Sequence, residues 1–245
     1  MLYGLKKKET DELEMVDKIL LRNILEAPVS SCVESLYLEL GVIPIHILLK
    51  ARRIVYFHYL VNLDTKEMLY KFFETQFKYA SKDDWAITVR NALKDFGIPE
   101  NFEFSKSKSV DSFKSLVKIK TKEYTMKYLL GLKADHTKMD NLVYSKLKMQ
   151  GYLKSAEIPA HEAKNLFRYR VRSANFKENV GDKYTNKVCP LCTVHLDTQT
   201  HSMECFKVKE EISVEGKYND IFKEKVPSNI SKTLLKITKL RENVI

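Results

Sequence analysis

Residues 45–58 read Ile45-His-Ile-Leu-Leu-Lys-Ala-Arg-Arg-Ile-Val-Tyr-Phe-His58 and directly follow Pro44. Proline suits the first position of a helix, because its fixed φ is already helical and its missing N–H is not needed there. The stretch is apolar around most of the helix circumference, with exceptions at Lys50, Arg52 and Arg53. A helix with so little polar surface needs other elements around it. Residues 44–61 therefore predict the central helix of a helical domain.

Apolar residues recur at helical spacing on both sides of this segment. Seven glycines and six prolines are too few for a turn-rich β-sandwich or barrel. Gly41, Gly97, Gly131 and Gly151 each follow a helix-like run and are expected to be C-terminal caps with positive φ. The expected fold class is mainly α: an irregular helical bundle of about eight to ten helices followed by a small zinc-knuckle module. Further helices are expected from Thr10 to Pro28, at 31–41 behind a Ser31–Glu34 capping box, from Asp64, at 81–97, 110–132, 144–149 and 159–173, and from Ser228.

Four segments are expected along the chain. Residues 1–100 would form an N-terminal helical bundle, and 110–175 a second helical segment that includes a basic helix at 159–173. A zinc module at 184–210 and a C-terminal tail with a helix at 211–245 would follow. The lysine- and serine-rich stretch 101–109 is the expected mobile connection.

The metal-ligating pattern is Cys189-x2-Cys192-x8-His201-x3-Cys205. Two cysteines separated by two residues can bind one metal through a tight turn, which Pro190 favours. His201 and Cys205 are one helical turn apart, on one face of a helix for which Asp197 is the expected N-cap. The four side chains make the tetrahedral Cys3His set that zinc prefers, so we expect one structural Zn²⁺.

A site with four protein ligands is closed, so its metal would stabilise the fold rather than activate water. His195 is an alternative nitrogen ligand, but it lies outside the expected helix. Clustered thiols indicate metal binding rather than disulfides, and hence an intracellular protein, in cytoplasm or nucleus. No apolar run of about 18 residues predicts a membrane span. The order of the N-terminal residues, apolar first and then Lys6 to Lys8, is wrong for a signal peptide.

The charge favours a polyanionic partner. The chain has 42 Lys and Arg against 32 Asp and Glu, a net charge of +10. In the predicted helix 159–173, three cationic residues form a stripe beside a stripe of apolar residues. Arginine is suited to phosphate, because it can bind it with two parallel hydrogen bonds. The alternative is a solvated helix face whose cations pair with nearby acids. The residues expected to contact RNA or DNA are Lys164, Arg168, Arg170, Arg172 and Lys177, with Lys114, Lys118 and Lys122 as further candidates.

Signatures of catalysis are missing from the sequence. It contains no glycine-rich phosphate loop, no G-x-S-x-G and no H-E-x-x-H. The adjacent pair Asp83-Asp84 begins a predicted helix, where acids suit the helix dipole. The sequence therefore indicates a protein that is not an enzyme.

Three stretches together resemble the C-terminal region of non-LTR (LINE-type) retrotransposon reverse transcriptases. They are Leu36-Tyr-Leu-Glu-Leu-Gly-Val-Ile-Pro-Ile45 leading into 50–58, Phe167-Arg-Tyr-Arg-Val-Arg172 with Asn175-Phe-Lys177, and the Cys-Pro-Leu-Cys…His…Cys cluster followed by Tyr218-Asn-Asp-Ile-Phe222. The resemblance implies a helical thumb or linker, then a CCHC zinc knuckle that engages nucleic acid. The aromatic-x-Asp-Asp box of the polymerase is missing, so RNA-templated DNA synthesis is not implied.

Two functions remain open from the sequence. The first is a non-catalytic nucleic-acid-binding fragment or remnant of such a polymerase, with a structural zinc. The alternative is a helical protein-interaction scaffold with a structural zinc and no nucleic-acid role. Its support is the aromatic content of residues 56–77, which could drive self-association if it is exposed.

Overall fold

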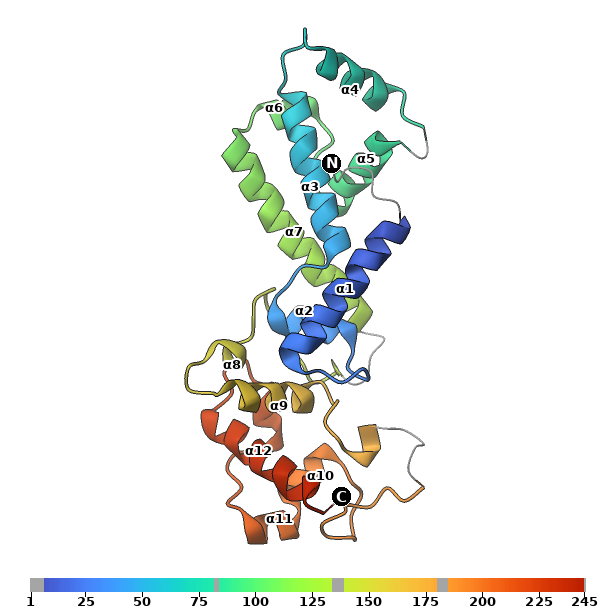
Figure 1. Cartoon of the computed structure of the whole chain (residues 1–245). Coiled ribbons are helices and arrows are strands. Elements are labelled where there is room, and N and C mark those ends of the chain that lie inside the picture. The colour runs from blue at the N-terminus through green and yellow to red at the C-terminus, as the bar shows by residue number, and fades with distance from the viewer. Residues whose placement is uncertain (1–6, 82–83, 134–138, 180–184, 245) are drawn as a thin grey trace. The chain divides into compact units, whose positions relative to one another are not determined.

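The computed structural model describes residues 7–81, 84–133, 139–179 and 185–244. This part of the chain is mainly helical, as predicted, and contains no strand (Figure 1). None of its helices combines the length and the apolar character needed to cross a membrane. The helices are α1 (Lys7–Leu25), α2 (Val33–Leu40), α3 (Ile45–Val61), α4 (Met68–Lys78), α5 (Trp85–Phe96), α6 (Phe102–Lys106), α7 (Val110–Lys133), α8 (Gly151–Lys154), α9 (Ala160–Arg170), α10 (Gln199–Glu204), α11 (Phe206–Glu211), the 3₁₀ helix η3 (Tyr218–Phe222) and α12 (Ser228–Glu242).

The chain divides into two compact units. The first consists of residues 1–17 and 43–130, and the second of residues 18–42 and 131–245. This division differs from the four segments expected from the sequence. Residues 18–42 group with the C-terminal half because the Glu39 carboxylate of α2 accepts a hydrogen bond from Arg170 of α9.

Helix α3 is the centre of the first unit, as its apolar pattern predicted. Ile47, Ile54 and Phe57 are buried in one cluster with residues of α4, α5 and α7. The expectation of a mobile connection at 101–109 is wrong, because residues 102–106 form α6. The Asn101 side chain accepts a hydrogen bond from the Glu103 N–H, and the Phe102 ring stacks on Phe73 with centroids 5.5 Å apart.

The second unit is built on α9, which packs against α12. Leu166, Phe167 and Tyr169 of α9 are buried. The predicted helix at 144–149 is wrong. This segment instead lies against α2, where the Gln150 N–H donates to the Glu39 carbonyl at 2.9 Å, and this non-local pairing replaces helical hydrogen bonds.

The capping residues expected from the sequence are confirmed at some helix ends and wrong at others. Gly41 and Gly97 are left-handed C-caps, as predicted. Gly131 lies inside α7 and Gly151 begins α8, so the cap prediction is wrong for both. The Ser31–Glu34 capping box does not form either, because Cys32 occupies the N-cap of α2 and makes no side-chain cap bond.

Candidate metal centre

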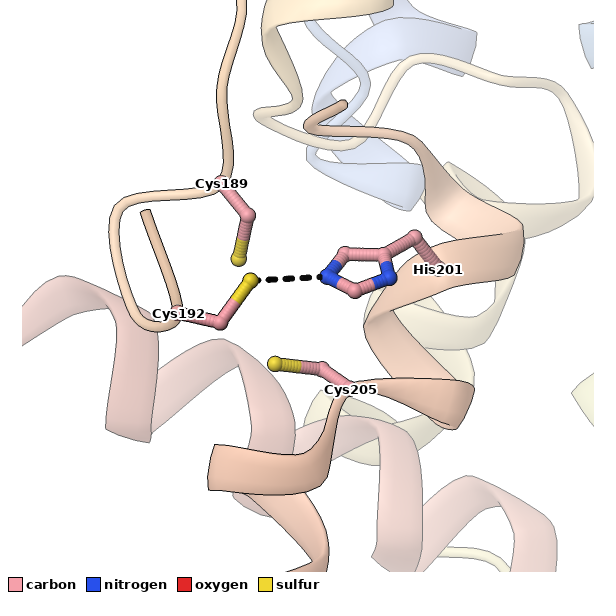
Figure 2. A group of neighbouring side chains, drawn as sticks. All are labelled: Cys189, Cys192, His201 and Cys205. Atoms are coloured by element: carbon pink, nitrogen blue, oxygen red, sulfur yellow. Dashed lines mark hydrogen bonds between the residues drawn. The ribbon is translucent and has the colours of Figure 1, made fainter. Parts of the chain in front are cut away.

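The four predicted ligands lie together in the second unit (Figure 2). One potential ligand atom from each of Cys189, Cys192, His201 and Cys205 lies within 4.8 Å of every other. The three cysteines are buried and unpaired by disulfides, while His201 is half-buried. Three sulfurs and one imidazole nitrogen converging on one point match the tetrahedral donor set of structural zinc sites. These residues can therefore hold one metal ion.

A tight turn positions the first two cysteines. The Thr193 N–H donates to the Cys189 carbonyl at 2.9 Å, which closes the turn around Cys192. The Cys189 N–H donates to the His195 carbonyl at 2.7 Å, and Val188 forms an isolated antiparallel bridge with Leu196. The bridge brings together the two ends of the loop that carries Cys189 and Cys192.

Helix α10 positions the other two ligands. The Thr198 hydroxyl accepts a hydrogen bond from the His201 N–H and caps the helix, and the Cys205 N–H donates to the His201 carbonyl at 2.7 Å. Asp197 is therefore not the N-cap, contrary to the prediction. The register of the helix places the cap one residue later, and the Asp197 side chain points elsewhere.

The choice between the two histidines follows from distance. His201 Nε2 lies 3.3 Å from the Cys192 sulfur, whereas His195 Nδ1 lies 3.9 Å from it. The two rings stack with centroids 4.9 Å apart, and His195 is the exposed one. His201 thus belongs to the four-residue cluster, and the exposed His195 ring stacks on it.

The thiols differ in their readiness to lose a proton. Burial raises the pKa of Cys189 to about 11. Burial also opposes ionisation of Cys192, but hydrogen bonds from the backbone amides of His195 and Val194 outweigh it and lower the pKa of that thiol to about 5. Metals bind cysteine as the thiolate, so metal binding would release the remaining thiol protons.

A buried ion pair stabilises the loop that carries Cys189 and Cys192, which is called the metal loop below. The Asp197 carboxylate accepts hydrogen bonds from the Arg241 guanidinium of α12 and from the Lys177 backbone N–H. The Lys177 ammonium donates to the Val188 carbonyl at 2.9 Å, one residue before Cys189. Sequence reasoning missed these supports, because the partners lie 20 and 44 positions from Asp197 and leave no local pattern.

The predicted nucleic-acid contacts separate into three groups. Lys164 and Arg168 are half-buried and bind Glu26, through an ion pair at 2.7 Å and a hydrogen bond to its carbonyl at 3.0 Å. Arg170 is buried and bonded to Glu39 and to the Ile221 carbonyl, so the prediction that it contacts nucleic acid is wrong. The helix face that carries Arg170 is internal because η3 packs against α9. Lys177 braces the metal loop.

Arg172 has a different setting from the other cations. It follows α9 with a φ of +48°, a left-handed conformation that is uncommon for a residue with a side chain. Burial raises the pKa of Tyr218, and the adjacent Arg172 guanidinium offsets part of that rise. Arg172 therefore lies beside Tyr218, close to the metal module.

Tyr218 lines a groove next to the candidate metal centre. The groove has a volume of about 700 Å³ and lies between α10, α11 and the segment that leads into η3. Its polar lining includes Thr200, Lys209, Lys217 and Asn219, with Glu204 as the acidic member. Both lysines are exposed. Sequence spacing gave no sign of this groove.

Comparison of the chain with protein-family models, with curated proteins and with solved structures found no match.

Proposed function

We propose that this chain is a non-catalytic nucleic-acid-binding protein whose metal module and adjacent groove bind RNA or DNA. The observation that carries the proposal is the groove of about 700 Å³ beside α10, in which Lys209 and Lys217 accompany the aromatic ring of Tyr218. Lysines neutralise phosphates, and aromatic rings accept stacked bases of a single strand. Arg172, beside Tyr218, adds a third cation.

The metal in this proposal is one structural Zn²⁺. Sulfur-rich, four-ligand sites select zinc over magnesium or calcium, which prefer oxygen. Four protein ligands would complete a tetrahedral coordination shell and leave no position for water or substrate, so the ion would organise residues 185–210 and do no chemistry. Such ions contribute on the order of 10 kcal/mol to small modules.

Metal analysis tests this part directly. We expect about one zinc per chain, and cobalt substitution should give the visible absorption of a tetrahedral thiolate site. Cys192→Ser should lose the ion and expose 185–210 to hydrogen exchange, whereas Cys32→Ser should keep both properties. Full protection of 185–210 in metal-free protein would contradict a structural role.

The order of segments supports the same reading. A helical body, the basic segment 164–172 and a CCHC cluster resemble the C-terminal region of LINE-type reverse transcriptases, in which such a knuckle engages nucleic acid. The net charge of +10 suits a phosphate backbone. Polymerase activity is not part of the proposal, because the family's catalytic aspartate box has no counterpart in the chain.

Binding to a labelled single-stranded oligonucleotide, measured by anisotropy at several salt concentrations, tests the groove. Lys209→Glu/Lys217→Glu should weaken binding and flatten the plot of log affinity against log salt, by about 0.7 per lost phosphate contact. The matched control is Lys232→Glu/Lys239→Glu on α12, which changes the net charge equally at exposed positions. Equal losses in both variants, or no binding by the native chain at low salt, would refute the groove as the site.

The alternative function is a protein-interaction scaffold, and one observation favours it. On α4, Met68 and Phe72 are 74% and 68% exposed, and Tyr79 just beyond the helix is 71% exposed. Exposed aromatic side chains in one region are typical of protein interfaces. The alternative predicts that Phe72→Ala changes partner capture while oligonucleotide affinity stays constant.

A further inference from the structure

A second groove lies in the first unit, between α3 and α7. Its volume is about 640 Å³. Leu48, Val55 and Tyr59 of α3 contribute apolar surface on one side, and Val117 of α7 on the other. Leu48 and Tyr59 are 38% and 53% exposed, so large apolar side chains face solvent here without cover from the described residues.

Cations form the rim of this groove on both sides. Arg52 belongs to α3, and Lys114 and Lys118 belong to α7; all three are exposed. Arg53 also lines it, and its buried Nε has no hydrogen-bond partner. None of the described residues that line the groove is acidic. The positive charge of the groove therefore favours a binding partner that carries carboxylates or phosphates along its edges.

The spacing of the lining residues selects a helix. Along α3 the lining positions 48, 52, 55 and 59 recur every three or four residues, and along α7 positions 114, 118 and 121 do the same. Two such rows form ridges with a continuous trough between them, into which the side chains of a third helix can pack. The apolar floor between the rows fits aliphatic side chains better than it fits a sugar-phosphate backbone.

Helix α1 carries the complementary pattern. In its first-unit part, Leu13, Met15 and Val16 are 41%, 58% and 61% exposed. Glu9 and Glu12 precede Val16 at seven and four positions, and both are exposed, so acids and apolar residues share one side of the helix. The opposite side is held in its own unit, where Glu14 bonds His46 of α3. An apolar, acidic helix face and an apolar, cationic groove are thus both uncovered in the same chain.

We propose that two copies of this chain form a two-fold dimer, in which the α1 face of each copy lies in the α3–α7 groove of the other. Val16 and Leu13 would fill the apolar floor, and Glu12 would meet Arg52 and Lys118 at its rim. The contact is reciprocal, so two copies satisfy both surfaces of each chain. No unoccupied binding surface is then left for a third copy. The proposal stands on the first unit alone and does not depend on nucleic-acid binding or on the metal.

Charge reversal on each surface tests the dimer. By light scattering or sedimentation, the native chain should have twice its 28.6 kDa mass. Arg52→Glu/Lys118→Glu and Glu12→Lys should each be monomeric, because acid would face acid or base would face base. An equimolar mixture of the two variants should regain the dimer, since each then meets an opposite charge at both contacts. Lys71→Glu/Lys94→Glu, at exposed positions of α4 and α5, is the control and should stay dimeric.

Two results would overturn the proposal. One is a native chain that stays monomeric at all attainable concentrations. The other is a dimer that survives both reversals, or a mixture of the two variants that remains monomeric while each folds normally by circular dichroism. If Arg52→Glu/Lys118→Glu instead abolishes oligonucleotide binding by a native monomer, the groove is a nucleic-acid site. Val16→Glu, which keeps every cation, should also give a monomer.

Discussion

The Arg241 guanidinium makes two parallel hydrogen bonds to the Asp197 carboxylate, with Nη1–Oδ1 at 2.6 Å and Nη2–Oδ2 at 2.9 Å. Both side chains are buried, and the guanidinium lies over the Phe176 ring at 4.2 Å. Asp197 follows the Cys189–Cys192 turn and precedes the helix that carries His201. The last helix of the chain therefore fixes the link between the two halves of the candidate metal centre.

Loss of this ion pair should destabilise the second unit. Arg241→Met leaves the Asp197 carboxylate buried without its cation, which costs about 3–5 kcal/mol of unfolding free energy. The control Lys239→Met removes an exposed cation of the same helix and should cost less than about 0.5 kcal/mol.

Denaturant unfolding followed by circular dichroism measures the effect. The single tryptophan, Trp85, lies in the first unit, so its fluorescence transition should stay in place while the dichroism transition moves to lower denaturant. Asp197→Asn/Arg241→Met should recover part of the loss, because no charge is then left buried. Equal stability of Arg241→Met and the native chain would contradict the structural role.

Arg170 and Arg168 are two residues apart and should behave in opposite ways. Arg170→Met breaks the buried pair with Glu39, which also accepts a hydrogen bond from Tyr144 at 2.8 Å, so we expect a loss of about 3–5 kcal/mol. Arg168→Met removes half-exposed contacts to Glu26 and should cost about 0–1 kcal/mol. Thermal unfolding of the two variants makes the comparison. A milder effect at Arg170 than at Arg168 would mean that Arg170 is not buried as described.

Gly41 and Gly97 share a left-handed backbone but differ in their surroundings. A Cβ at Gly41 would lie 2.3 Å from the Lys148 carbonyl carbon, whereas a Cβ at Gly97 would meet nothing within 4 Å. Gly97→Ala should therefore cost only the conformational term of about 1–2 kcal/mol. Gly41→Ala should cost clearly more, since the backbone of 148–149 has to move. Equal losses in unfolding free energy, each referred to its own unit, would show that Lys148 does not approach Gly41.

The Cys32 thiol should react slowly. Burial, followed by the nearby Glu34 carboxylate, raises the pKa of Cys32 to about 12. Because the folded state favours the neutral thiol, this contribution to stability is constant below the ordinary pKa near 9 and is lost as pH rises from about 9 to 12. At pH near 8 the folded chain has about a thousandth of the unfolded thiolate population.

Alkylation with iodoacetamide, read on the Cys32 peptide by mass spectrometry, checks this. The native rate should be about three orders of magnitude below the rate in urea, and it should rise about tenfold per pH unit up to pH 10. Similar rates in native and unfolded protein would contradict the pKa shift.

Local sequence determined much of this protein. The apolar pattern of 45–58 gave the central helix, since spacing of three to four residues depends on no distant partner. The four metal ligands followed from the sequence too, because a turn and one helical turn bring them together within 17 residues. Gly97 ended its helix as expected for the same local reason.

Only the tertiary structure decided which polar residues are free to act. The sequence does not distinguish the three arginines of this segment, but their surroundings differ. Arg168 pairs with Glu26 and Arg170 is buried in an ion pair with Glu39, whereas Arg172 lies beside Tyr218. The partners of Gln150 and of Asp197 also lie far from them in the sequence. Burying a cation costs free energy that a buried acid beside it offsets, and whether that acid is present depends on how α2, α9 and α12 pack.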